Sequence, residues 1–114
     1  MQTVGRQNQV FHALGDPTRR AVYQELIASE ETVCALTARF SVSQPAISQH
    51  LRTLREAGLV EVRQEAQWRV YSLRPEPLAE LDEWLGAYRA LWERRMGALH
   101  AEIERGKQER KAEQ

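Results

Sequence analysis

The sequence contains only one cysteine, Cys34, so no disulfide can form within the chain and nothing in it requires an oxidising compartment. No apolar run approaches the roughly 20 residues needed to cross a bilayer. The first nine residues lack the apolar segment of a secretory signal. We therefore expect a cytoplasmic protein with no membrane partner, and its 114 residues are enough for one small core.

The formal net charge is zero, which argues at first against a nucleic-acid partner. The charges are unevenly distributed, however. Residues 39–74 carry six basic and three acidic side chains, whereas residues 75–114 carry seven basic and nine acidic ones. The basic middle segment is where we expect a DNA-binding surface.

Apolar spacing and capping residues predict four helices in the first half of the chain. Asp16, Thr32 and Ser43 are suited to N-caps, and Gly58 is suited to the position after a helix C-terminus. A polar break separates the second helix from the third at residues 29–31. The predicted helices cover residues 7–14, 17–28, 33–39 and 44–57.

Two runs of alternating β-branched or aromatic and polar residues follow. They predict a hairpin with strands over 59–63 and 68–73 and a tip over 64–67. A helical pattern then runs from Glu76 to about Arg105. The predicted fold class is mainly α with a β-hairpin wing, a winged helix-turn-helix of order α-α-α-α-β-β-α.

The long last helix carries one apolar stripe, which a domain this small cannot bury alone. We expect a homodimer, with residues 1–105 forming one DNA-binding and dimerisation domain and residues 106–114 a charged flexible tail. The alternative is that the helix folds back over its own core. The dimerisation residues predicted from the first and last helices are Val10, Phe11, Leu85, Tyr88, Trp92, Met96, Leu99 and Ile103.

The fourth helix is amphipathic. Ile47, Leu51 and Leu54 cluster within about 60° on a helical wheel and are predicted to face the core. The outward face is short and polar, and such side chains can bond base edges or phosphates in the major groove. A merely solvated helix face is the alternative. The outward residues are Ser43, Gln44, Ala46, Ser48, Gln49 and Arg52.

Arg63 and Arg69 flank the hairpin tip, where they are candidates for contacts with the DNA backbone or the minor groove. A charged surface hairpin is the alternative. An enzyme is not expected, because the chain has no phosphate loop, nucleophile elbow or metal cluster. The competing function is a winged-helix module for protein–protein contact without direct DNA reading.

Two segments carry a family resemblance. Phe-His-Ala-Leu-Gly-Asp-Pro-Thr-Arg-Arg at 11–20, and Ser-Gln-Pro-Ala-Ile-Ser-Gln-His-Leu at 43–51 with Leu-Arg-Glu-Ala-Gly-Leu-Val at 54–60, resemble the ArsR/SmtB-type repressors. The match covers about residues 9–95. It implies a dimeric bacterial winged-helix repressor that leaves its operator on sensing a signal. It also implies DNA-facing roles for Ser43, Gln44, Ser48, Gln49, His50 and, on the wing, Arg69.

The chain departs from that family in two ways. Many members have glycine at the hairpin tip, where this chain has Glu65-Ala66-Gln67. The Cys-x-Cys metal ligands of the third helix are reduced to Cys34, and on the last helix His100 and Glu104 stand alone. Because a tight site needs three or four converging ligands, no metal or other cofactor is expected. Control through the level of the protein itself, a bound small molecule or a partner protein is expected instead. The alternative is a metal site in which His100 and Glu104 of two copies meet across a dimer.

Two residues keep alternative interpretations. His50 either contacts a phosphate or packs between helices. Cys34 is either a redox sensor or, as buried cysteines usually are, a small apolar residue. The predicted function is that of a homodimeric repressor binding double-stranded DNA at an inverted-repeat operator. The predicted DNA-binding residues are Ser43, Gln44, Ala46, Ser48, Gln49, His50, Arg52, Arg63 and Arg69.

Overall fold

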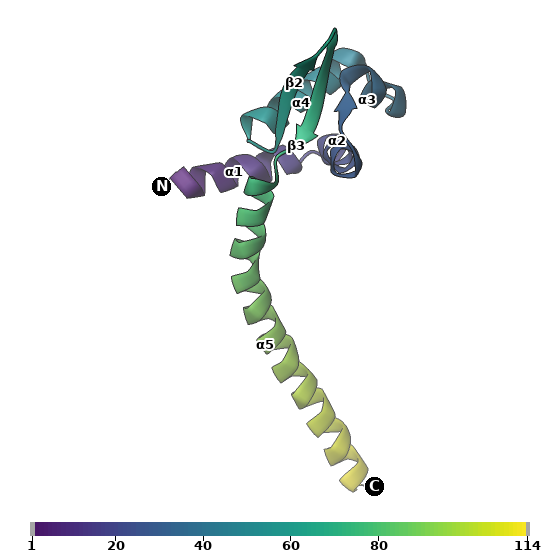
Figure 1. The fold of residues 1–114 in the computed structure, drawn as a ribbon. Helices are drawn as coiled ribbons and strands as arrows, with labels where there is room; N and C mark the ends of the chain where they lie inside the picture. The colour runs from purple at the N-terminus through teal and green to yellow at the C-terminus, as the bar shows by residue number, and fades with distance from the viewer. Residues whose placement is uncertain (1, 114) are drawn as a thin grey trace. The chain divides into compact units, whose positions relative to one another are not determined.

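The computed structural model describes residues 2–113. The elements are α1 (Gln2–Leu14), α2 (Pro17–Ala28), β1 (Glu31–Thr32), α3 (Val33–Arg39), α4 (Gln44–Glu56), β2 (Val60–Glu65), β3 (Trp68–Leu73) and α5 (Pro75–Glu113) (Figure 1). The chain divides into two compact units, Met1–Ala79 and Glu80–Gln114.

The core of the first unit is formed by the apolar faces of its helices and by the sheet. Ile47, Leu51 and Leu54 of α4 are completely buried, which confirms the helical-wheel prediction. They share this core with side chains of α2, α3 and the strands, since α4 packs against all three. Fully burying each such aliphatic side chain contributes about 1.5–3 kcal/mol to the stability of the fold. The core therefore fixes the orientation of α4 and which of its faces is exposed.

The predicted N-caps are confirmed. The Asp16 carboxylate accepts a 2.8 Å hydrogen bond from the Arg19 backbone N–H at the start of α2. The Thr32 hydroxyl accepts from the third residue of α3, and the Ser43 hydroxyl from the third residue of α4. Each bond satisfies one N–H that has no partner within the helix, so all three helices begin where the sequence predicted.

The sheet has three antiparallel strands in the order β1-β3-β2, one more than the predicted hairpin. β1 consists of Glu31, the last residue of the predicted polar break, and the predicted N-cap Thr32, and it pairs Glu31 with Tyr71 and Thr32 with Val70. β2 reaches Glu65, so the tip is the two-residue turn Ala66–Gln67 rather than the predicted 64–67. Backbone pairing with β3, not a hydrophobic pattern, makes the short β1 a strand.

Two predicted helix boundaries are wrong. The first helix was expected to begin at Gln7, but α1 begins at Gln2. The tail expected over residues 106–114 is helical as far as Glu113. Its lysines, arginines, glutamates and glutamines are good helix formers, so the charged composition from which a flexible tail was predicted is equally compatible with a helix.

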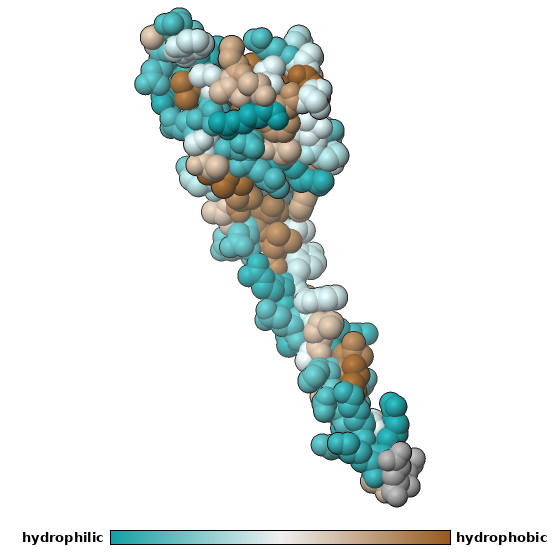
Figure 2. Space-filling view, turned by 90° about the vertical axis from the view of Figure 1, so that its right-hand side faces the viewer, coloured by the Kyte–Doolittle hydropathy of each residue, from teal (hydrophilic) through white to brown (hydrophobic). Residues whose placement is uncertain are grey.

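The surface of α5 carries several large apolar side chains among its charged residues. Figure 2 shows apolar patches among hydrophilic surface along this helix. Among the described residues, no helix is both long and apolar enough to cross a membrane. The large exposed apolar side chains of α5 are Trp84, Leu85, Tyr88, Leu91, Trp92, Met96, Leu99 and Ile103.

Val10 does not belong to an exposed interface, contrary to prediction. Its side chain is 2% exposed and is part of the core, whereas the neighbouring Phe11 is 44% exposed. The sequence pattern placed both on a helix but could not separate the inward-facing residue from the outward-facing one.

Candidate nucleic-acid interface

The outward face of α4 is polar, as predicted. Gln44, Ser48, Gln49 and Arg52 are exposed, and Ala46 is half-buried. Ser43 is also exposed. Its hydroxyl accepts the 3.3 Å bond from the Ala46 N–H, and its own proton remains available for donation. The helix therefore presents donors and acceptors over its first three turns, which suits contacts with base edges.

The two arginines predicted on the wing lie on opposite faces of the sheet. In the β2–β3 register Gln64 pairs with Arg69 and Arg63 pairs with Val70. Because side chains alternate along a strand, Arg63 and Arg69 point to opposite sides. Arg69 shares its side with the buried Tyr71, so it belongs to the face that packs towards the helices.

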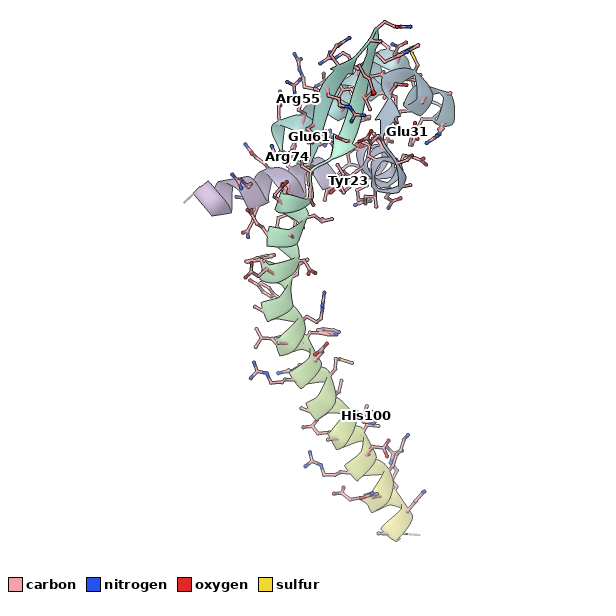
Figure 3. The ribbon with its side chains drawn as sticks, viewed as in Figure 1. Tyr23, Glu31, Arg55, Glu61, Arg74 and His100 are labelled. Atoms are coloured by element: carbon pink, nitrogen blue, oxygen red, sulfur yellow. The ribbon has the colours of Figure 1, made fainter. Side chains whose placement is uncertain are left out.

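Arg69 and α4 line a common groove of about 520 Å³, which we call the α4–β3 groove. Arg55, labelled in Figure 3, also lines this groove, although the sequence did not single it out. Arg55 lies three residues after Arg52 and seven after Ser48, so all three share one flank of the helix. The lining residues are Val33, Pro45, Ser48, Gln49, Arg52, Arg55, Arg69 and Tyr71.

A second groove of about 330 Å³ adjoins the first, because Val33, Ser48 and Arg69 line both. It extends to the wing tip at Gln67 and to Trp68, whose side chain is 49% exposed. An exposed aromatic ring offers a flat apolar face for contact with a sugar or a base. The two grooves together form one surface from the wing tip to the middle of α4.

The arginines of the α4–β3 groove differ from the other arginines of the first unit. Arg52, Arg55 and Arg69 make no hydrogen bond or ion pair with any described residue, whereas every other arginine of this unit does. Three exposed guanidinium groups thus converge on one groove with no carboxylate to neutralise them. Such a groove favours a phosphate backbone, because guanidinium groups bind phosphate strongly.

Arg63 belongs to a different cluster. Its guanidinium donates to Glu30 at 2.6 Å and to Glu65 at 3.2 Å. These carboxylates raise the pKa of Arg63, and the hydrogen bond from Arg63 lowers the pKa of Glu30. The structure therefore does not bring Arg63 into the groove, and its predicted DNA contact is not supported.

His50 lies near the N-terminus of α2. It is half-buried, and its Nδ1 is shielded from solvent without a hydrogen-bond partner. The pKa of Asp16 is lowered chiefly by the hydrogen bond from the Arg19 N–H and, to a smaller extent, by the charge of His50. This location favours the helix-packing interpretation of His50 over a phosphate contact.

Cys34 is exposed, so of its two interpretations the buried apolar residue does not hold. It lines the second groove near Ser48. Within residues 2–113, no three His, Cys, Asp or Glu side chains converge as a metal site would require.

Comparison with known proteins agrees with this geometry. Residues 16–62 match the family model of the bacterial regulatory proteins of the arsR family. The chain is 33% identical over 78 residues to the transcriptional repressor SdpR of Bacillus subtilis, covering 68% of this chain and 87% of SdpR. It is 45% identical over 80 residues to the arsenic resistance transcriptional regulator ArsR1 of Pseudomonas putida, covering 68% of this chain and 59% of that protein.

A solved structure extends the likeness to the fold. The ArsR-like transcriptional regulator from Rhodococcus sp. RHA1 superposes with a TM-score of 0.73 at 31% identity, covering 87% of this chain and 93% of that one. The fold and the groove define a winged-helix DNA-binding transcriptional regulator, not an enzyme. The chain belongs to the ArsR family.

Proposed function

We propose that this chain acts in the cytoplasm as a homodimeric repressor of an inverted-repeat operator. α4 enters the major groove and reads bases through Gln44, Ser48, Gln49 and Arg52. The observation that carries this proposal is the convergence of Arg52, Arg55 and Arg69, all without partners, on the α4–β3 groove.

The phosphate backbone separates the major groove from the neighbouring minor groove. When α4 lies in the major groove and the wing lies at the minor groove, the phosphate backbone passes between α4 and the wing. Arg55 and Arg69 line this passage beside the base-reading Arg52, and each phosphate that these two neutralise releases counterions, which makes affinity depend on salt. A protein-binding module is less well supported, since the outward face of α4 lacks the aromatic or aliphatic anchors of protein interfaces.

The proposed dimer presents two α4 helices to two half-sites, about one or two helical turns apart. Its interface is formed by Phe11 and the exposed apolar side chains of α5. Release from DNA follows binding of a small molecule or a partner protein rather than a metal ion. The name of the relative from Pseudomonas putida refers to arsenic resistance. This chain has Cys34 as its single cysteine.

The test begins with selection of genomic DNA fragments that bind the protein, followed by fluorescence anisotropy on the recovered site. Gln49→Ala combined with Arg52→Ala should weaken binding by about 1–3 kcal/mol per lost base contact and relax specificity. Gln24→Ala, at an exposed position of α2, is the control. If the double variant bound the recovered site as tightly as the wild type, α4 would not carry the reading face.

A further inference from the structure

The second groove lies at an open edge of β3. β1 ends at Thr32, which pairs with Val70, so Trp68 and Arg69 extend beyond the end of β1. Side chains alternate along a strand, so these two neighbours leave β3 on opposite sides. Both line the second groove, which therefore runs along the strand edge between the Trp68 indole and the Arg69 guanidinium.

These two side chains offer different kinds of contact to a ligand. The Trp68 side chain is 49% exposed, so much of its ring is free to stack on another planar group. The Arg69 guanidinium makes no hydrogen bond or ion pair with any described residue. A guanidinium binds a carboxylate through two parallel hydrogen bonds. Together they suit a flat ring that carries a carboxylate.

The rest of the groove also favours an anion. No acidic side chain is among the described residues that line it. The side chains of Gln44, Ser48 and Gln67 make no hydrogen bond with any described residue, and each can donate one to a carboxylate oxygen. The volume of about 330 Å³ lies at the lower end of the range for small-ligand sites, which suits a molecule of one or two rings.

We infer that the second groove binds a small aromatic carboxylate, and that this ligand competes directly with operator DNA. Its ring lies against Trp68, and its carboxylate bonds Arg69. In the proposed function Arg69 binds phosphate, and Gln44 and Ser48 read bases, so the ligand and DNA need the same groups. The inference rests on that function and deepens it, because it names the class of molecule that releases the operator.

The location of the groove gives the sign of the effect. Ser48 and Arg69 line both this groove and the α4–β3 groove, so a ligand bound here occupies part of the surface proposed for DNA. Two ligands that exclude each other from one surface lower each other's affinity by the same factor. The aromatic carboxylate is therefore an inducer rather than a corepressor, and it displaces DNA without any movement of α4.

Three related compounds test this chemistry on the full chain without DNA. 2-Naphthoate has the flat ring and the charge, 2-naphthamide lacks the charge, and decahydro-2-naphthoate lacks the flat ring. Calorimetry at constant ionic strength should show that 2-naphthoate binds at one site per chain and that the other two bind more weakly. Equal binding of all three, or of none, would overturn the inference without any variant being made.

Variants then test the location. Arg69→Gln should lower the affinity for 2-naphthoate about tenfold or more, since a charge-assisted pair is lost. Arg63→Gln, on the other face of the wing, is the matched control and should leave it unchanged. Trp68→Leu should abolish the preference for 2-naphthoate over decahydro-2-naphthoate, whereas Trp68→Phe should retain it. Circular dichroism shows whether each variant is folded, and unchanged 2-naphthoate binding by folded Arg69→Gln would place the site elsewhere.

The inference and the proposed function fail separately. In anisotropy with the recovered operator, 2-naphthoate should weaken DNA binding as it fills its site, and 2-naphthamide at the same concentration should not. Operator binding that 2-naphthoate leaves unchanged would overturn the inference alone. Binding of 2-naphthoate by a chain that recovers no genomic DNA would refute the repressor function and, with it, the competition.

Discussion

Arg63 and Glu30 form an ion pair with 2.6 Å between the guanidinium Nη2 and the carboxylate Oε2. The pair joins the segment before β1 to β2, on the side of the wing away from Arg69. Two arginines that the sequence places on either side of the hairpin tip therefore have different roles. Arg69 is available to an external anion, and Arg63 is occupied within the protein.

This difference gives a paired prediction on DNA binding. Arg55→Gln and Arg69→Gln should each lower affinity for all sequences alike and reduce the magnitude of the salt slope by about 0.9, as loss of one phosphate contact does. Arg63→Gln should leave both quantities unchanged. Anisotropy at several salt concentrations measures them, and an effect of Arg63→Gln as large as that of Arg69→Gln would show that both faces of the wing bind DNA.

A second prediction concerns acid stability. The hydrogen bond from Arg63 lowers the pKa of Glu30 below its ordinary value of 4.5. A carboxyl with a lowered pKa in the folded state stabilises the protein above the unfolded pKa, and this contribution is lost as the pH falls through the folded pKa. Glu30→Gln should therefore lower the urea midpoint at pH 7 and converge with the wild type in acid.

Arg63→Gln is the matched control for that experiment. It removes the same ion pair by changing the other partner. The variant that combines Glu30→Gln with Arg63→Gln should therefore be no less stable than the less stable of the two single variants. Additive losses at pH 7 would show that the two side chains stabilise the fold independently.

A third prediction concerns the wing tip. Ala66 has a φ of 55°, in the left-handed region that costs an L-residue about 1–2 kcal/mol. It occupies a two-residue hairpin turn, in which glycine is preferred. Ala66→Gly should stabilise the protein by about 0.5–1 kcal/mol, because the relief of strain exceeds the entropy cost of glycine.

Thermal unfolding measures this effect as a rise of a few degrees in Tm. Ala66→Val is the opposite variant and should lower Tm, since a β-branched residue tolerates positive φ poorly. A lower Tm for Ala66→Gly would mean that chain entropy outweighs the backbone strain.

The fourth prediction is that no metal ion controls this regulator. His100, labelled on α5 in Figure 3, has Glu104 one turn later and few other ligands nearby. Within residues 2–113, His100 belongs to no group of three or more His, Cys, Asp or Glu side chains placed to hold an ion. Calorimetry of reduced protein with zinc, nickel, copper(I) and arsenite should show no tight stoichiometric uptake. Uptake that releases DNA, and is lost in His100→Ala, would locate a site.

Local features were predictable from the sequence. The caps at Asp16, Thr32 and Ser43 and the buried face of α4 depend on residues within one or two turns of one another. β1 was missed because two polar residues form a strand only through their pairing with β3, which lies far along the chain.

The role of Arg55 was missed for the same physical reason. Helical spacing places it on the flank of Arg52, but only the packing of β3 beside α4 makes that flank one wall of a groove. The opposite orientations of Arg63 and Arg69 depend on strand register, which the predicted four-residue tip left undefined. Contacts between distant segments therefore account for what the sequence did not predict.

The pairing of β1 with β3 has a mechanical consequence. β1 runs directly into Thr32, whose hydroxyl caps α3, so the outer strand of the wing and the first helix of the helix-turn-helix share adjoining residues. Swinging the wing away from α4 would break this ladder and disturb that cap at the same moment. The wing is therefore held at a fixed distance from α4, and in the proposed repressor a signal bound outside the second groove would release DNA by moving α4 and the wing together.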